Sequence, residues 1–269
     1  MIVMSRLNKF ILPTVVVTLI VCLTVNAAPV NAAPVALTAT EDTYITVGGM
    51  TGHYNYGGSP SIFVGDFLGV TYVGLVRFDL SSIPAGSTIN SAFLNLYGTG
   101  FMGAAQTGRP YNVLRVTESW VEGTANGATE TGSCDWFDRE HGTLSWTNAG
   151  GTSSSEHFAS ASVPPAPGLM TWTVTDIVKD WIEGGKANYG FMITDGGPGP
   201  PGGATDFASS ETTAPDPKPL LEIDYSPPRP VGGYFVPVNK LAILAPYLAL
   251  VSLVGAVTLA VATPRRRKP

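Results

Sequence analysis

Apolar residues in the middle of this chain recur at every second position in short runs, and this alternation limits the folds that the chain can adopt. Ala92, Leu94 and Leu96 fall on one side of an extended backbone, and the segment Met170–Val174 repeats the pattern. Runs with the 3.6-residue period of a helix are rare, and 31 glycines and 22 prolines separate the short runs. We therefore expect an all-β domain in which each strand buries one face.

The same pattern predicts one short helix and one hairpin among the strands. Thr175 precedes apolar residues spaced along one side of a helix and is the expected N-cap. Two strand-like runs flank a turn at Pro84–Gly86, which favours a β-hairpin. The segment 150–168 is expected to be a connector without strands. The predicted strands are Asp42–Val47, Ser61–Gly65, Val70–Leu80, Ile89–Tyr97, Tyr111–Val116, Thr143–Trp146, Met170–Thr175, Gly190–Thr194, Thr205–Ser209 and Leu220–Tyr225.

Both ends of the chain have features of export and membrane anchoring. A basic start, an apolar run and small residues predict a secretory signal peptide over residues 1–36, with a retained N-terminal anchor as the alternative. Residues 241–262 carry no charge and precede a basic tail, 263–269, so they predict a transmembrane helix with that tail in the cytoplasm. Between the domain, 37–225, and this helix lies a Pro/Gly-rich stalk, 226–240. We expect a single-pass protein with its N-terminal domain at the cell surface; removal of the helix by a sorting enzyme stays open.

The expected extracellular part is acidic and holds a single cysteine. Leu37–Pro228 contains seven Lys and Arg residues against all twenty Asp and Glu residues, a net charge of −13. A field of this sign repels nucleic acid, so a DNA or RNA partner is not expected. Cys22 belongs to the signal segment, which leaves Cys134 without an internal disulfide partner. Stability must then come from packing or from a bound metal ion.

A series of short motifs covers nearly all of the segment from Asp42 to Tyr225. The motifs are "EDTYI", "NYG", "FVGD", "LVRFDLSSIPAGSTINSAFLNLY", "VLRVTESWVEG", "LSWTN", "WTVTDIVKDWIEG", "NYGFMI", "FASSE" and "PLLEIDY". In this order the chain resembles the DNRLRE domain family, which includes carbohydrate-binding modules found beside alginate lyases and in archaeal disaggregatase-type proteins. The resemblance implies a jelly-roll-like β-sandwich that binds polysaccharide, and the C-terminal segment is similar to the anchors of archaeal surface proteins.

Aromatic residues in polar loops are the best candidates for a ligand contact. The chain has no His-Glu-x-x-His, Gly-x-Ser-x-Gly or Walker-type motif, so an enzyme is not expected. Sugars stack their apolar faces on aromatic rings while polar groups bond the hydroxyls. The segments "CDWFDRE" and "GHYNYGG" offer this combination, although the aromatic residues of the first segment would alternatively pack as a lid against the sandwich. The candidate ligand-binding residues are Trp136, Phe137, Asp138, Arg139, Tyr54 and Tyr56.

A structural Ca²⁺ ion would suit an exported acidic sandwich without disulfides, because Ca²⁺ is bound by clustered carboxylate and carbonyl oxygens. Asp42, Asn55 and Glu211 belong to three of the motifs and are the expected ligands. The alternative is an ion pair of Asp42 or Glu211 with Arg77 inside the sandwich. A zinc site is not expected, because one cysteine and three histidines scattered in loops do not form a recognisable ligand pattern.

These features favour a membrane-anchored surface module that binds an extracellular polysaccharide or envelope glycan without catalysis. One alternative is a structural envelope protein that assembles with itself or with a surface lattice. A second alternative is an enzyme that cleaves polysaccharide, since two carboxylates at a suitable distance suffice for that chemistry.

Overall fold

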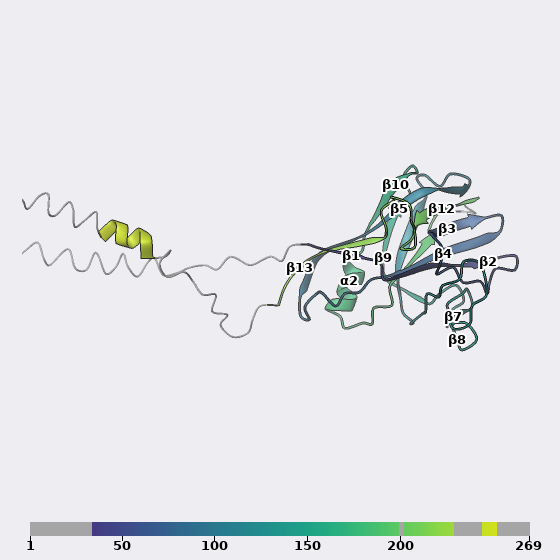
Figure 1. The fold of residues 1–269 in the computed structure, drawn as a ribbon, viewed down its shortest axis with the longest axis horizontal. Coiled ribbons are helices and arrows are strands. Elements are labelled where there is room, and N and C mark those ends of the chain that lie inside the picture. The colour runs from purple at the N-terminus through teal and green to yellow at the C-terminus, as the bar shows by residue number, and fades with distance from the viewer. Residues whose placement is uncertain (1–33, 199–201, 229–243, 252–269) are drawn as a thin grey trace, which may run out of the picture. The chain divides into compact units, whose positions relative to one another are not determined.

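The computed structural model describes residues 34–198, 202–228 and 244–251, and the chain divides into two compact units, Met1–Pro228 and Arg229–Pro269 (Figure 1). The predicted signal peptide and stalk lie almost entirely outside the described residues. Of the predicted transmembrane segment only residues 244–251 are described, and these are helical. Within the described ranges, no helix combines the length and the apolar character needed to cross a membrane.

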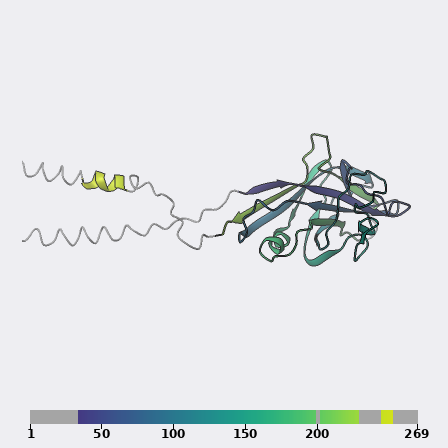
Figure 2. The same ribbon diagram turned by 60° about the horizontal axis from the view of Figure 1, so that its bottom comes forward.

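The first unit is built on a curled antiparallel sheet of eleven strands, consistent with the expected β-sandwich (Figure 1, Figure 2). The strand order is β1-β13-β5-β12-β3-β4-β11-β6-β9, with β10 pairing with β5 and β2 pairing with β4, while β7 and β8 form a separate small sheet. The elements are β1 Val35–Thr38, β2 Glu41–Val47, β3 Ser61–Phe67, β4 Val70–Arg77, β5 Thr88–Gly103, β6 Pro110–Val116, β7 Asp138–Glu140, β8 Leu144–Ser145, β9 Ser153–Ser162, β10 Gly168–Thr173, α2 Thr175–Ile182, β11 Phe191–Asp195, β12 Gly203–Ala208 and β13 Leu220–Ser226.

The larger hydrophobic core fills the inside of the curled sheet. Leu94, Trp172 and Phe207 are fully buried there, on strands that are far apart in the sequence. The indole nitrogen of Trp172 donates a hydrogen bond to the carbonyl oxygen of Tyr111 at 2.9 Å, and the Tyr111 hydroxyl donates to the carbonyl oxygen of Val64 at 2.7 Å. The polar atoms of these two large side chains are therefore satisfied inside the core.

A second, smaller core lies on the other face of the β2–β4 pair. Leu75 packs into this second core, whereas the next residue, Val76, packs into the larger one, because neighbouring residues of a strand point to opposite faces. Ile45 on β2 joins Leu75, and Trp120 and Cys134 cover them from the long connector after β6. Both faces of this part of the sheet are thus buried, and the connector that supplies the cover is fixed to it.

The predicted hairpin between β4 and β5 is wrong. The strand β4 pairs with β2, β3 and β11, whereas β5 pairs with β10, β12 and β13. The turn at Pro84 does form, with the Ser87 N–H bonded to the Pro84 carbonyl oxygen at 3.1 Å. However, the connector 78–87 is longer than a hairpin loop of about two to five residues, and it buries Leu80 and Ile83 in the larger core. It therefore carries the chain from one part of the sheet to another.

The predicted connector at 150–168 contains a strand, β9, which the sequence did not reveal. This strand is mostly Ser, Ala and polar residues, so it has little of the apolar alternation that marks the other strands. It ends the strand order and pairs with β6. A strand in this position buries few side chains, and backbone pairing alone leaves no hydrophobic signal in the sequence.

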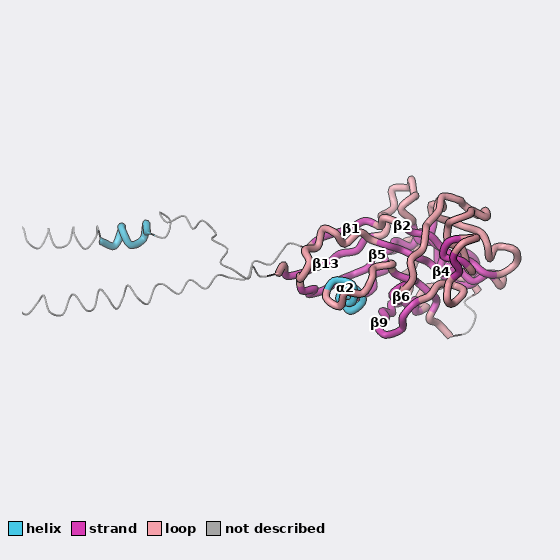
Figure 3. The backbone as a smooth tube through the Cα atoms, turned by 90° about the horizontal axis from the view of Figure 1, so that it is seen from below, coloured by secondary structure: helices cyan, strands magenta, loops and turns pink. Residues whose placement is uncertain are grey.

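The helix α2 lies beside the sheet and begins without the predicted cap (Figure 3). Val174 occupies the N-cap position, and no side chain caps the helix there. The hydroxyl oxygen of Thr175 instead accepts a hydrogen bond from the Ala92 N–H of β5 at 3.0 Å. Thr175 thus ties the helix to the sheet, and Ile177, Val178 and Trp181 bury the expected apolar face.

Candidate ligand and metal sites

Two connectors meet at one end of the first unit, and the second of them contains the short strands β7 and β8. We refer to residues 48–60, between β2 and β3, as the first loop, and to residues 117–152, between β6 and β9, as the second loop. The Trp136 N–H of the second loop donates a hydrogen bond to the Gly52 carbonyl oxygen of the first loop at 3.1 Å. Because the second loop is fixed over the second core, this contact also fixes the first loop.

Asn55 joins the two loops from a buried position. Its side-chain amide group donates hydrogen bonds to the carbonyl oxygens of Glu122 and Cys134, and its side-chain oxygen accepts one from the Gly57 N–H at 3.0 Å. Asn55 is 1% exposed. This residue, expected from the sequence as a metal ligand, is bonded to backbone groups of both loops.

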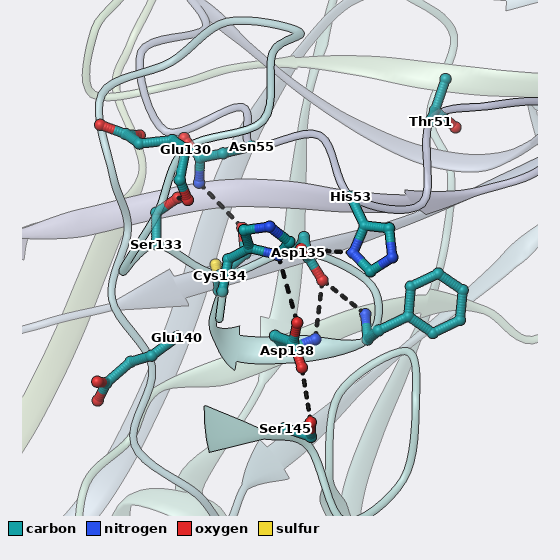
Figure 4. Close-up of polar contacts among 12 residues, drawn as sticks. Thr51, His53, Asn55, Glu130, Ser133, Cys134, Asp135, Asp138, Glu140 and Ser145 are labelled. Carbon is teal, nitrogen blue, oxygen red and sulfur yellow. Dashed lines mark hydrogen bonds and ion pairs between the residues drawn. The ribbon is translucent and has the colours of Figure 1, made fainter. Parts of the chain in front are cut away.

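Four metal-binding side chains converge where the loops meet: His53 from the first loop, and Asp135, Asp138 and His141 from the second (Figure 4). One ligand atom from each residue can be chosen so that all four lie within 4.8 Å of one another. The Nδ1 atoms of His53 and His141 lie 3.2 and 2.8 Å from one oxygen of Asp135, and Nδ1 of His141 lies 3.3 Å from an oxygen of Asp138. The expectation that the histidines are scattered is wrong for these two.

The two aromatic residues of the segment "CDWFDRE" have different environments. Trp136 is half-buried against the second core, and its ring passes so close to Gly150 that a Cβ there would lie 2.7 Å from it. Phe137 is 41% exposed, and its ring centroid lies 4.8 Å from that of His53. Trp136 therefore packs against the domain, as the alternative reading of this segment as a lid predicts. Phe137 instead presents its ring to solvent.

The charged neighbours of Phe137 are held by hydrogen bonds within the second loop. The Ser145 hydroxyl donates to one oxygen of Asp138 at 2.6 Å. The guanidinium group of Arg139 donates to the hydroxyl of Ser119 at 2.7 Å. The Asp138 side chain is only 15% exposed, so its carboxylate lies mostly covered beside Phe137, and Arg139 braces the loop.

The two tyrosines of the first loop, Tyr54 and Tyr56, have different environments. Tyr56 stacks on Tyr44 of β2 with ring centroids 4.2 Å apart and packs against the larger core. Burial raises the pKa of Tyr56 above its ordinary value. Tyr54, two residues earlier, is half-buried. Tyr56 therefore has a place in the packing of the domain.

A second cluster consists of the carboxylates of Asp42, Glu122 and Glu211, with one ligand atom from each lying within 4.8 Å of the others. Asp42 is 1% exposed; one of its oxygens accepts the Ser210 N–H at 2.9 Å, and the other is buried without a hydrogen-bond partner. One oxygen of Glu211 is likewise buried and unpaired. Arg77, the alternative partner, forms its ion pair with Glu41 instead.

Burial, and to a smaller extent the charges of neighbouring carboxylates, raises the pKa of two members of this cluster, Asp42 and Glu122. Burial, and then the charge of Glu211, raise the pKa of Asp42 to about 7. Burial also raises the pKa of Glu122 to about 7, with further contributions from the charges of Glu211 and Asp42. Near neutral pH, this cluster therefore binds protons, unless a cation takes their place.

Glu122 and the His53 cluster are the functional candidates that the sequence did not reveal. Glu122 stands in the motif "TESWVEG", where nothing distinguishes it from an exposed acidic residue. The spacing Asp135-x-x-Asp138-x-x-His141 is visible in the sequence, but its fourth member, His53, is supplied by a loop about 80 residues earlier. His53 reaches the other three residues only because the two loops meet in the folded chain.

Comparison with known proteins decides the class of this domain. The sequence model of carbohydrate-binding module family 96 matches residues 33–225, which span all thirteen strands but for the last residue of β13. The chain belongs to carbohydrate-binding module family 96. No curated protein matches it. Membership in family 96 makes a glycan the expected partner of the β-rich unit. Phe137 of the second loop is an exposed ring whose centroid lies 4.8 Å from that of His53 in the first loop.

Proposed function

We propose that this chain is a cell-surface module that binds an extracellular polysaccharide or envelope glycan without cleaving it. The match to carbohydrate-binding module family 96 over residues 33–225 is the observation that carries this proposal. The jelly-roll-like form of the sandwich implied by the sequence resemblance is part of the same proposal.

The glycan contact is assigned to the end of the unit where the two loops meet. Phe137 offers an exposed ring on which the apolar face of a sugar stacks, and the Asp138 carboxylate, bonded to the Ser145 hydroxyl, fixes the loop beside that ring. Trp136 supports Phe137 from below, since its own ring packs toward Gly150 and the second core. Arg139 braces the second loop through Ser119, and Tyr56 supports the first loop from the core.

The non-catalytic role rests on where the carboxylates lie. Asp42, whose raised pKa is of the kind found in acid–base catalysts, is 1% exposed, and the Ser210 N–H holds one of its oxygens. A polysaccharide does not reach a carboxylate at that depth. The cluster of Asp42, Glu122 and Glu211 is better suited to a structural Ca²⁺ ion, which binds ionised carboxylates and would remove their mutual repulsion.

Export and anchoring complete the proposal. The signal-like residues 1–36 and the uncharged segment 241–262 with its basic tail support a location of the family 96 domain outside the cell, on the stalk 226–240. The sequence pattern supports this topology. Protease added to intact cells should therefore digest the domain, and protection of the domain from protease would contradict the assignment.

A glycan array probed with the purified full-length chain tests the binding function. Retention of a defined glycan, lost in Phe137→Ala and kept in Phe158→Ala, is the expected result. Phe158 is a matched control because it is 62% exposed but lies on β9. Self-assembly of the chain without retention of any glycan would favour the structural alternative, and turnover of a retained glycan would show an enzyme.

A further inference from the structure

We propose that His53, Asp135, Asp138 and His141 form a binding site for a divalent transition-metal ion of the Zn²⁺ class, which fastens the first loop to the second. The inference depends on the geometry of these side chains and is independent of the glycan that the module binds. The four ligand atoms come from both loops and lie within 4.8 Å of one another.

The ligand set suits zinc better than calcium. Imidazole nitrogen is a ligand for Zn²⁺, Co²⁺ and Ni²⁺, whereas Ca²⁺ takes oxygen ligands. Two ligands placed about 2.0 to 2.1 Å from one ion at a tetrahedral angle lie about 3.3 Å apart. The distances from His53 to Asp135 and from His141 to Asp138 are 3.2 and 3.3 Å, and that from His141 to Asp135 is 2.8 Å. These spacings need little change to accept an ion.

Each carboxylate is oriented through its other oxygen. One oxygen of Asp135, which is 1% exposed, accepts the N–H groups of Phe137 and Asp138, both at 2.8 Å, so the other oxygen points to the two histidines. One oxygen of Asp138 accepts the Ser145 hydroxyl (Figure 4), and the other lies 3.3 Å from Nδ1 of His141. Hydrogen bonds of this kind from outside the ligand set are typical supports of a metal site.

Hydrogen bonds account for the orientation of the two aspartates, but they do not satisfy both histidine side chains. Nδ1 of His141 is buried and has no hydrogen-bond partner, although oxygens of Asp135 and Asp138 lie close to it. Nδ1 of His53 points at the same oxygen of Asp135. In the described part of the chain, all the ion pairs of these two aspartates are with histidines and none is with Lys or Arg. A divalent cation would satisfy all four groups together.

Four protein ligands make a closed site, which in zinc proteins is structural. The expected consequence is local: the ion would join His53 to the second loop beside the exposed ring of Phe137, whose centroid is 4.8 Å from that of His53. The first loop would then be held at the glycan-binding end by a metal in addition to the backbone contact between Trp136 and Gly52.

The test is a titration of the full-length chain, stripped with EDTA and dialysed, with ZnCl₂ in a calorimeter. We expect one Zn²⁺ per chain, and Co²⁺ in its place should give the intense visible absorption of a four-coordinate ion. His53→Gln and His141→Gln should each weaken Zn²⁺ binding by at least about tenfold, the lower end of the loss seen when even a supporting residue is changed. His157→Gln is the matched control: its Nδ1 faces Asp180 outside the cluster, so this variant should bind Zn²⁺ like the wild type.

The same variants separate a metal ligand from a merely structural histidine. His53 is half exposed, so His53→Gln should keep the circular dichroism spectrum of the wild type. Zn²⁺ should raise the melting temperature of the wild type, of His157→Gln and of Asp42→Asn. It should not raise that of His53→Gln or His141→Gln. The proposal would be overturned if the wild type did not bind Zn²⁺, or if His53→Gln and His141→Gln bound Zn²⁺ with the same affinity as the wild type.

Discussion

The buried carboxylate of Asp42 predicts that the metal-free protein loses stability as pH rises toward neutrality. In the folded chain the pKa of this group is about 7, whereas in the unfolded chain it has an ordinary value near 4. Between these values the folded state holds a proton that the unfolded state has released, so the free energy of unfolding falls with pH and levels off above about pH 7. At about 1.4 kcal/mol per pH unit, the two units between pH 5 and the folded pKa amount to about 3 kcal/mol.

Urea denaturation of the full-length chain at pH 5 and at pH 8, with EDTA present, measures this effect. Asp42→Asn keeps an oxygen that accepts the Ser210 N–H but cannot ionise. Its free energy of unfolding should therefore change between the two pH values by about 3 kcal/mol less than that of the wild type. Glu140→Gln, which alters a carboxylate outside the cluster, should leave the pH dependence unchanged. An identical pH dependence in the wild type and in Asp42→Asn would refute the reasoning.

Three further outcomes are expected from the same structure. At pH 8, Ca²⁺ added to the EDTA-treated chain should raise the melting temperature of the wild type but not that of Glu211→Gln, because the ion needs ionised carboxylates; an equal rise in both contradicts the site. Trp172→Ala should lower the free energy of unfolding by about 3 to 5 kcal/mol, since the ring is fully buried and bonded to the Tyr111 carbonyl; urea denaturation showing a loss below about 1 kcal/mol is inconsistent with this packing. Burial raises the pKa of the Cys134 thiol, so a thiol reagent should label it only in denaturant, and rapid labelling of the folded chain would contradict its position.

The sequence predicted strands best where one face of the strand is apolar and the other polar. The run around Leu94 and Leu96 lies in β5, and that around Trp172 lies in β10, with those side chains fully buried. By contrast, β9 has few apolar residues, and its pairing with β6 depends on backbone bonds that any sequence can form. The exchange of partners around β4 and β5 was also missed, because the length of the connector 78–87 is compatible with several topologies.

The residues of the candidate sites, like the strands, could be predicted from the sequence only in part. The motifs containing Asp42 and Glu211 indicated that these residues converge, and their carboxylates do lie together, but Glu122 completes the cluster from a loop with no regular pattern. His53 and His141 meet because hydrogen bonds hold the two loops together, among them those of the Asn55 amide group and that of the Trp136 N–H to the Gly52 carbonyl. Such non-local contacts have no periodic signal in the sequence.

The pairing of β1 with β13 determines where the proposed glycan contact lies relative to the two ends of the family 96 domain. Val35 lies opposite Ile223, so the first and last strands of the domain run side by side and the chain enters and leaves the unit at the same end (Figure 1). The small sheet of β7 and β8, with the loops that hold Phe137 and His53, lies at the far end of that unit (Figure 1). A tether joined to the domain at Val35 or at Ser226 is therefore attached at the end opposite the surface proposed to bind glycan, and immobilising the domain through either point should leave that surface accessible.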